Sequence, residues 1–156
     1  MISIKDFHRS FDGNEVLRGV SLEIKRGEVI ALIGGSGSGK SVLLKHVAGL
    51  MQPDQGQIVV DGKDLRRVKG RGLIDFRDRL GFLFQGGALF DSMTVFENVA
   101  FPLKEKTGLS DELVRERVFK ELEGVGLSGS EHKHPSQISG GMVKRAAIAR
   151  ALGYGP

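Results

Sequence analysis

The stretch that decides the fold of this 156-residue chain is Gly34-Gly35-Ser36-Gly37-Ser38-Gly39-Lys40-Ser41. It matches the phosphate-binding loop pattern G-x-x-x-x-G-K-[ST] at every fixed position. The glycines allow backbone turns that are closed to other residues and bring several N–H groups close to one anion. Lys40 can reach the β- and γ-phosphates of a nucleotide, and the Ser41 hydroxyl can bind Mg²⁺. The stretch therefore predicts a nucleotide-phosphate site, against the simpler interpretation of a flexible glycine–serine turn.

The residues on both sides of this loop fit the same prediction. Residues 28–33 form a short apolar run with β-branched side chains, which is typical of a strand buried on both faces. Apolar residues recur at helical spacing over 42–50, and Gly49 and Pro53 mark the end of that helix. A strand, a glycine-rich loop and a helix in this order are the context that the phosphate-binding motif requires.

The composition is that of a globular domain, or of part of one. Hydrophobic residues make up 40% of the chain and charged residues 27%. The chain has no cysteine, which excludes a disulfide framework and a thiolate metal site and fits a reducing cytosol. No stretch approaches the roughly eighteen apolar residues of a membrane span, and the N-terminus lacks the pattern of a secretory signal.

The charge balance allows two interpretations. The net charge is +4, from 23 basic and 19 acidic residues. This charge suits a nucleotide or an anionic lipid surface, and scattered lysines on a solvated surface explain it equally well. Because the basic residues form no long run and are not interleaved with aromatic residues, the sequence does not indicate a nucleic-acid partner.

The first half of the chain predicts a mixed sheet. Alternating apolar residues before and after the turn signal Asp12-Gly13-Asn14 predict two antiparallel strands within the first 30 residues. Residues 57–62 predict another strand that ends in a turn, and the basic residues of 63–79 predict an exposed connector with weak helical character. Residues 80–84 are apolar again and predict a strand that ends at Gln85.

The second half predicts helices with identifiable first residues. Thr94, with Glu97 three residues later, predicts a capping box at the start of one helix. Ser110 predicts the start of a second helix that ends near Gly124 or Gly126, and Ser139 predicts the start of a last helix through Ala151.

The four histidines are His8, His46, His132 and His134, and they raise the question of a metal site. His132 and His134 have only Glu131 as a neighbouring carboxylate and lie in a polar stretch. We interpret this pair as solvated loop residues rather than as metal ligands.

Three further segments resemble motifs of the ABC-type ATPases. Residues 138–145, Ile-Ser-Gly-Gly-Met-Val-Lys-Arg, resemble the family's L-S-G-G-Q signature, and residues 146–152 match the Ala-Arg-Ala run that follows it. Gln85 resembles the glutamine of the family's Q-loop. Phe11 lies where the family places an aromatic residue against the adenine ring, with packing in the core as the alternative. The resemblance covers essentially the whole chain, in the family's order.

The resemblance implies an α/β fold of the P-loop NTPase type. The expected architecture is an ABC ATPase core with an antiparallel β subdomain and an α-helical subdomain, incomplete at the C-terminus. The implied partial domain spans 1–156, with the β and P-loop core at 1–86, the helical subdomain at 87–138 and the signature helix at 139–156.

The resemblance also implies ATP and Mg²⁺ as cofactors. The residues that would contact ATP in one chain are Phe11, Gly34, Gly35, Ser36, Gly37, Ser38, Gly39, Lys40, Ser41 and Gln85. Mg²⁺ would be held by Ser41 and Gln85. Two copies of the family's domain pair head to tail, so that the signature of each copy contacts the ATP of the other copy, here through Ser139, Gly140, Gly141 and Met142. Taken alone, Ser139 and the two glycines favour an ordinary helix N-cap preceded by a loop, and the presence of a phosphate-binding loop in the same chain reverses this preference.

Residues 86–103 indicate a sub-group. They resemble the ATPases of bacterial phospholipid transporters that work with MCE-type proteins, the Mla and toluene-tolerance group, and Met142 in place of the usual glutamine is similar to that group as well. The implied partners are a second copy of the chain, an integral membrane permease that docks near 86–103, and an MCE-type lipid-binding protein. The implied location is cytoplasmic, at the inner face of the bacterial inner membrane.

The resemblance implies no catalytic residue within this chain. The family's Walker B strand, which ends in Asp-Glu, and its switch histidine would both lie beyond Pro156. The expectation is therefore that the 156 residues alone, as a truncated piece of an ATPase, do not hydrolyse ATP.

Three alternatives remain open from the sequence. The first is the ATPase of another ABC importer or exporter, and the second is a non-catalytic fragment that binds nucleotide. The third is a P-loop GTPase or kinase, which would leave Ser139, Gly140 and Gly141 unexplained.

Overall fold

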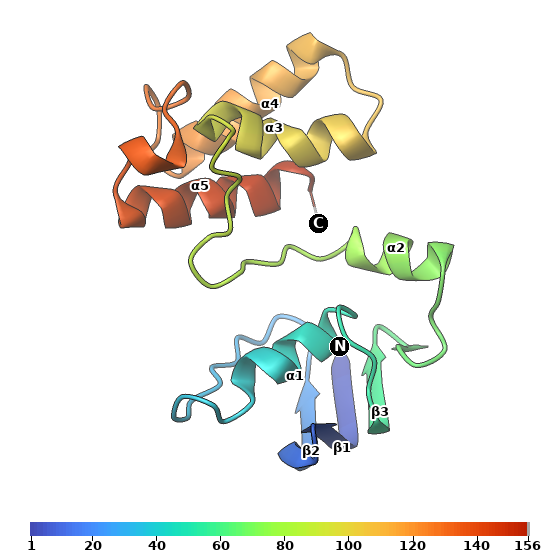
Figure 1. Cartoon of the computed structure of the whole chain (residues 1–156). Coiled ribbons are helices and arrows are strands. Elements are labelled where there is room, and N and C mark those ends of the chain that lie inside the picture. The colour runs from blue at the N-terminus through green and yellow to red at the C-terminus, as the bar shows by residue number, and fades with distance from the viewer. Residues whose placement is uncertain (156) are drawn as a thin grey trace. The chain divides into compact units, whose positions relative to one another are not determined.

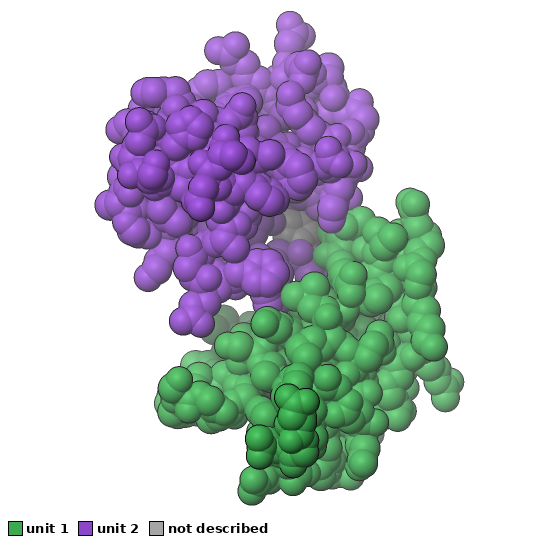
Figure 2. Space-filling view, in the orientation of Figure 1, with its two compact units in different colours: residues 1–78 green, residues 79–156 purple. Residues whose placement is uncertain are grey.

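The computed structural model describes residues 1–155. The chain forms two compact units, residues 1–78 and residues 79–156 (Figure 2). Among residues 1–155, no helix has the length and apolar character needed to cross a membrane. Each unit has its own set of buried side chains.

The first unit is built on an antiparallel sheet of four strands in the order β2-β1-β3-β4 (Figure 1). The strands are β1 (Ile2–Phe11), β2 (Asn14–Ile24), β3 (Gln55–Val60) and β4 (Lys63–Asp64). Phe11 pairs with Asn14 across the turn between β1 and β2, where Asp12 and Gly13 both have a positive φ. This two-residue turn confirms the hairpin predicted from the sequence, because positive φ at both central positions suits tight hairpins.

Helix α1 (Lys40–Val47) packs on this sheet, and α2 (Arg71–Arg77) follows β4 along the chain. The ring of Phe7 in β1 lies edge-on against His46 of α1, with 4.9 Å between the ring centroids. His46 is fully buried, and its two ring nitrogens lie 2.8 Å from the carbonyl oxygen of Val42 and 3.1 Å from that of Gln52. His46 thus ties the end of α1 to the segment that leads into β3.

The second unit is helical. Its elements are α3 (Val95–Lys106), α4 (Asp111–Gly124), the short 3₁₀ helix η1 (Pro135–Gln137) and α5 (Gly140–Gly153). The helix starts predicted from the sequence are confirmed, with Thr94, Ser110 and Ser139 as N-caps. Thr94 forms the predicted capping box with Glu97. Hydrogen bonds from the backbone N–H and the hydroxyl of Thr94 to the Glu97 carboxylate lower the pKa of that carboxyl.

The core of the second unit lies between α3, α4 and α5. Its fully buried apolar side chains are those of Val95, Val99, Ala100, Leu103, Val114, Val118, Leu122, Leu127, Ala146 and Ala149. Asn98 is buried beside them and is fully hydrogen-bonded. Its Oδ1 accepts from the Phe90 N–H at 2.7 Å, and its Nδ2 donates to the carbonyl oxygens of Phe90, Met93 and Thr94 at 3.0–3.2 Å. Asn98 therefore fixes the segment that precedes α3.

Two strands predicted from the sequence do not form. Residues 28–33 and 80–84 have no regular secondary structure, and the Val29 and Ile33 side chains are 96% and 95% exposed. The sheet that forms within residues 1–155 is therefore antiparallel throughout rather than mixed. An apolar run forms a parallel strand only where neighbouring strands complete its hydrogen-bond ladder, and neither segment has a paired neighbour in this part of the chain.

The hairpin carries a pH-sensitive contact. The ring nitrogens of His8 lie 3.0 Å from a carboxylate oxygen of Glu15 and 3.1 Å from one of Asp6, and these bonds raise the pKa of His8, that to Glu15 most strongly. Because the pKa of His8 is higher in the folded state than in the unfolded state, the contact stabilises the fold fully below about pH 6.5, and this stabilisation is lost as the pH rises through the folded-state pKa.

We expect an NMR titration midpoint for His8 above 6.5. Glu15→Gln should lower the midpoint, and an unchanged midpoint would contradict this assignment.

Candidate functional site: a phosphate-binding loop and a signature helix

The loop over residues 34–41 closes around the side chain of its own lysine. The Nζ atom of Lys40 donates to the carbonyl oxygens of Gly34 at 2.7 Å and Gly35 at 2.6 Å, and to the Ser38 hydroxyl at 3.2 Å. A weak backbone hydrogen bond from Ser38 to Gly35 closes the turn. The lysine ammonium therefore lies on the concave side of the loop, where a bound phosphate would meet it.

Gly39 of this loop has a conformational reason to be glycine. It has a φ of +87°, and a Cβ there would lie 2.6 Å from a methyl carbon of Leu17 and 3.1 Å from one of Val16. A Cβ on Gly34 would lie 2.8 Å from the Ser38 hydroxyl oxygen, which can rotate away. The left-handed backbone at Gly39, beside β2, is therefore the position of the loop that most requires glycine.

Helix α1 begins at the end of the loop with its first-turn N–H groups uncapped. Gly39 is the N-cap and provides no side-chain hydrogen bond, and the first turn holds no acidic residue, while Lys45 and His46 lie in the last turn. The basic residues of the last turn complement the negative C-terminal end of the helix dipole. The positive N-terminal end has no acidic side chain near it and is suited to binding an anion. Ser41, the expected Mg²⁺ ligand, is exposed in the first turn.

The remaining expected nucleotide contacts are divided between the two units. Phe11 ends β1 in the first unit and is partly exposed beside the hairpin turn. Gln85 lies in the second unit, exposed in a turn in which the Gly87 N–H donates to the Phe84 carbonyl oxygen at 3.0 Å. The structure thus brings Lys40 and Ser38 together within the loop, and it describes Gln85 within a separate unit.

The signature residues form the exposed start of α5. The Ser139 hydroxyl accepts from the Met142 N–H at 3.3 Å, so that Ser139 caps the helix. Gly140 and Gly141 are exposed in the first turn, and no acidic residue lies there. Met142 packs partly against the core, in contrast to the exposed glycines. The end of the helix therefore presents backbone N–H groups beside two residues without side chains.

Hydrogen bonds from α5 hold the segment that follows Gln85, and this contact could not be predicted from the sequence. The Arg150 guanidinium donates to the carbonyl oxygens of Ala88 at 2.7 Å and Gly87 at 2.8 Å, and its Cζ lies 6.0 Å from the Phe90 ring centroid. Gly87 has a φ of +86°, and a Cβ there would lie 3.1 Å from a methyl carbon of Val143. Burial lowers the pKa of the Arg150 guanidinium. Gly87 and Arg150 together hold the backbone after Gln85 on the signature helix.

Replacing Arg150 with glutamine should release this segment. A shorter neutral side chain cannot bridge two carbonyl oxygens, so we expect a loss of about 1–2 kcal/mol in the free energy of unfolding of the helical unit. The Gly87 amide should exchange its hydrogen faster. Lys144→Gln, an exposed change on the same helix, is the control. Equal exchange at Gly87 in the two variants would show that Arg150 does not hold the segment.

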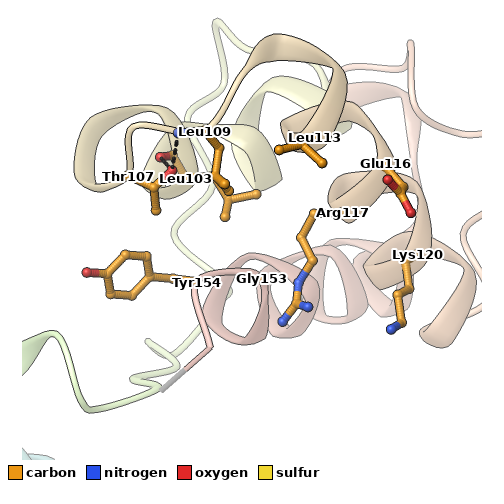
Figure 3. A pocket seen from close by; sticks show the side chains of 9 residues that line it. All are labelled: Leu103, Thr107, Leu109, Leu113, Glu116, Arg117, Lys120, Gly153 and Tyr154. Atoms are coloured by element: carbon orange, nitrogen blue, oxygen red, sulfur yellow. Dashed lines mark hydrogen bonds between the residues drawn. The ribbon is translucent and has the colours of Figure 1, made fainter.

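A cavity of about 420 Å³ lies elsewhere in the second unit, between the ends of α3 and α5 and one face of α4 (Figure 3). Its lining residues are Leu103, Thr107, Leu109, Leu113, Glu116, Arg117, Lys120, Gly153 and Tyr154. The Thr107 hydroxyl is engaged with the Leu103 carbonyl oxygen at 2.7 Å. None of the residues expected to contact nucleotide lines this cavity.

The glycine-rich loop at the start of α1 and the capped glycine end of α5 define a nucleoside-triphosphate-binding protein of the P-loop class. The profile of the ABC transporter family matches residues 17–156. This match covers most of the chain, which therefore belongs to the ABC transporter family. Membership of this family also confirms the α/β fold expected from the resemblance.

Curated relatives and solved structures agree with this assignment. The chain is 42% identical to the intermembrane phospholipid transport system ATP-binding protein MlaF of Haemophilus influenzae, over all of this chain and 59% of that protein. It is 45% identical to the probable ribonucleotide transport ATP-binding protein mkl of Mycobacterium leprae, over 99% of this chain and 45% of that protein. The chain thus spans less than two thirds of the length of these relatives.

The solved structure of the ATP-binding cassette MJ0796, a dimer bound to ADP and Pi, superposes with a TM-score of 0.91 at 32% identity. The similarity covers all of this chain and 71% of that chain. Because the superposition includes the phosphate-binding loop and the signature helix, both lie in the part of the fold that the two proteins share.

Proposed function

We propose that the chain is the nucleotide-binding part of an ABC transporter ATP-binding subunit that serves phospholipid transport. The observation that carries the proposal is the loop of residues 34–41, which holds Lys40 on its concave side at the uncapped start of α1. Mg-ATP would be bound with its phosphates in this loop, with Ser41 and Gln85 on the metal and Phe11 on the base.

A second copy of the chain would complete the nucleotide site. Ser139, Gly140, Gly141 and Met142 form the start of α5, where the two glycines are exposed and no acidic residue lies in the first turn. Such an electropositive helix start suits the phosphates of a nucleotide held by a partner. The dimeric relative bound to ADP and Pi supports this arrangement.

The docking surface for a membrane permease would lie over residues 86–103. Phe90 and Phe101 are 44% and 38% exposed, with their ring centroids 5.1 Å apart, so that they form an apolar patch where the segment before α3 meets the middle of α3. An apolar patch of this kind is typical of a surface that another protein covers. The subunit would accordingly act at the cytoplasmic face of a bacterial inner membrane, with an MCE-type lipid-binding protein in the same complex.

The phospholipid substrate rests on the similarity to MlaF, and the similarity to mkl favours a second candidate, an ABC transporter of another substrate. A chimera separates the two. Residues 1–156 would replace the aligned segment of full-length H. influenzae MlaF, and in parallel that of M. leprae mkl, and each chimera would be assembled with its own membrane partners.

We expect the MlaF chimera to restore ATP-dependent phospholipid transfer between vesicles, because residues 86–103 would dock on that permease. The same chimera with Lys40→Ala should be inactive. Activity of the mkl chimera alone would contradict the phospholipid assignment and support the second candidate. Inactivity of both chimeras, with intact Mg-ATP binding, would contradict both substrate assignments.

A further inference from the structure

Arg9 lies against the ring of Phe11, the residue expected to contact the nucleotide base. The guanidinium carbon of Arg9 is 4.6 Å from the Phe11 ring centroid, within the range of a cation–π interaction. Both residues belong to β1 and are two positions apart. One face of the Phe11 ring is therefore covered by a planar cation.

The position of Arg9 is set by contacts outside β1. Its Nη1 donates to the Asp54 carboxylate and to the carbonyl oxygen of Gln52 at 3.3 Å. The second carboxylate oxygen of Asp54 accepts from the Ser10 N–H at 3.2 Å. Asp54 thus contacts both the Arg9 side chain and the backbone N–H of Ser10 in the same strand. The bond to Ser10 fixes the carboxylate, and the carboxylate in turn holds the guanidinium beside the ring.

This arrangement differs from an ordinary surface ion pair. The Arg9 side chain is only 21% exposed, and its Nε is buried without a hydrogen-bond partner within the described residues. Leaving a buried donor unpaired costs free energy. The ion pair with Asp54 and the contact with the Phe11 ring are the interactions that offset this cost.

We propose that Arg9, clamped by Asp54, is a positioning residue that orients Phe11 so that its other face stacks on the purine base of the nucleotide. The inference rests on the proposed function. A ring already held in one rotamer loses less conformational freedom when a base stacks on it. A guanidinium on the far face also draws on the electrons of the ring, which favours stacking with an electron-rich base.

The test separates the base from the phosphates. Isothermal titration calorimetry would measure the binding of Mg-ATP and of Mg-tripolyphosphate, which has no base, to the whole chain and to its Arg9→Gln variant. We expect Arg9→Gln to weaken Mg-ATP binding about three- to ten-fold and to leave tripolyphosphate binding within about two-fold. Arg18→Gln, at an exposed arginine of β2, is the control and should change neither affinity.

Two further variants keep the test independent of any general damage to the sheet. Asp54→Asn, which releases the guanidinium but retains Arg9, should give the same base-dependent loss. Arg9→Gln should have no added effect in a Phe11→Leu background, because the cation would then have no ring to orient.

The outcomes are distinct. Equal weakening of both ligands would show that Arg9 only supports the fold, and no weakening of either would show that it has no role in binding; both results overturn the inference. Mg-ATP binding that Lys40→Ala leaves unchanged would overturn the proposed function itself, whatever Arg9→Gln does.

Discussion

Replacing Lys40 with alanine is expected to weaken Mg-ATP binding by about one to two orders of magnitude. The estimate follows from the roughly 1.5–3 kcal/mol that a hydrogen bond to a charged group contributes. The lysine ammonium is the cation that the loop holds on its concave side, so its removal also leaves the carbonyl oxygens of Gly34 and Gly35 without that donor. Binding would be measured by isothermal titration calorimetry on the whole chain.

The chain offers a matched control for this variant. Lys45→Ala removes an exposed lysine from the last turn of the same helix, at the end that does not face the loop. It should leave the affinity for Mg-ATP within about two-fold, because an exposed lysine in the last turn is not one of the groups that would contact the phosphates. Similar losses in the two variants would mean that general attraction by the basic chain, and not the loop, holds the nucleotide.

Replacing Asn98 with leucine is expected to destabilise the helical unit by about 2–4 kcal/mol. The side chain is fully buried, and leucine of similar size would fill its place without any polar group. The Phe90 N–H and the Met93 carbonyl oxygen would then lose the partner that Asn98 gives them. An unmet buried donor or acceptor costs about 1–3 kcal/mol each. Chemical denaturation followed by circular dichroism would measure the change.

Glu105→Leu is the control for introducing leucine into the same helix, because Glu105 is exposed near the end of α3. It should change the free energy of unfolding by no more than about 0.5 kcal/mol. A loss for Asn98→Leu as small as that of the control would show that the segment before α3 does not depend on Asn98.

The helical half and the hairpin could be predicted from the sequence because their signals are local. Thr94 and Glu97 form a capping box within one turn, and Ser139 caps α5 within three residues. The hairpin follows from two residues that accept a positive φ at Asp12 and Gly13. The turn around Lys40 was also predictable, since Gly37 and Gly39 both adopt the positive φ that favours glycine.

The features that the sequence did not reveal depend on residues far apart along the chain. Residues 28–33 carry the composition of a buried strand, yet a strand is defined by its neighbours, and none pairs with it in residues 1–155. The contacts of Arg150 with Gly87 and of Arg9 with Asp54 join segments 63 and 45 residues apart. The packing of His46 against Phe7 likewise joins two residues far apart along the chain, so the burial of His46 could not be predicted from the helix alone.

The hydrogen bonds of Lys40 have an energetic consequence for ligand binding. Three oxygen atoms of the loop surround the ammonium, so a triphosphate bound in the loop would take the place of some of these partners. Binding would then be an exchange of partners rather than a simple addition. Only the difference in free energy between the two sets of hydrogen bonds would contribute to the affinity.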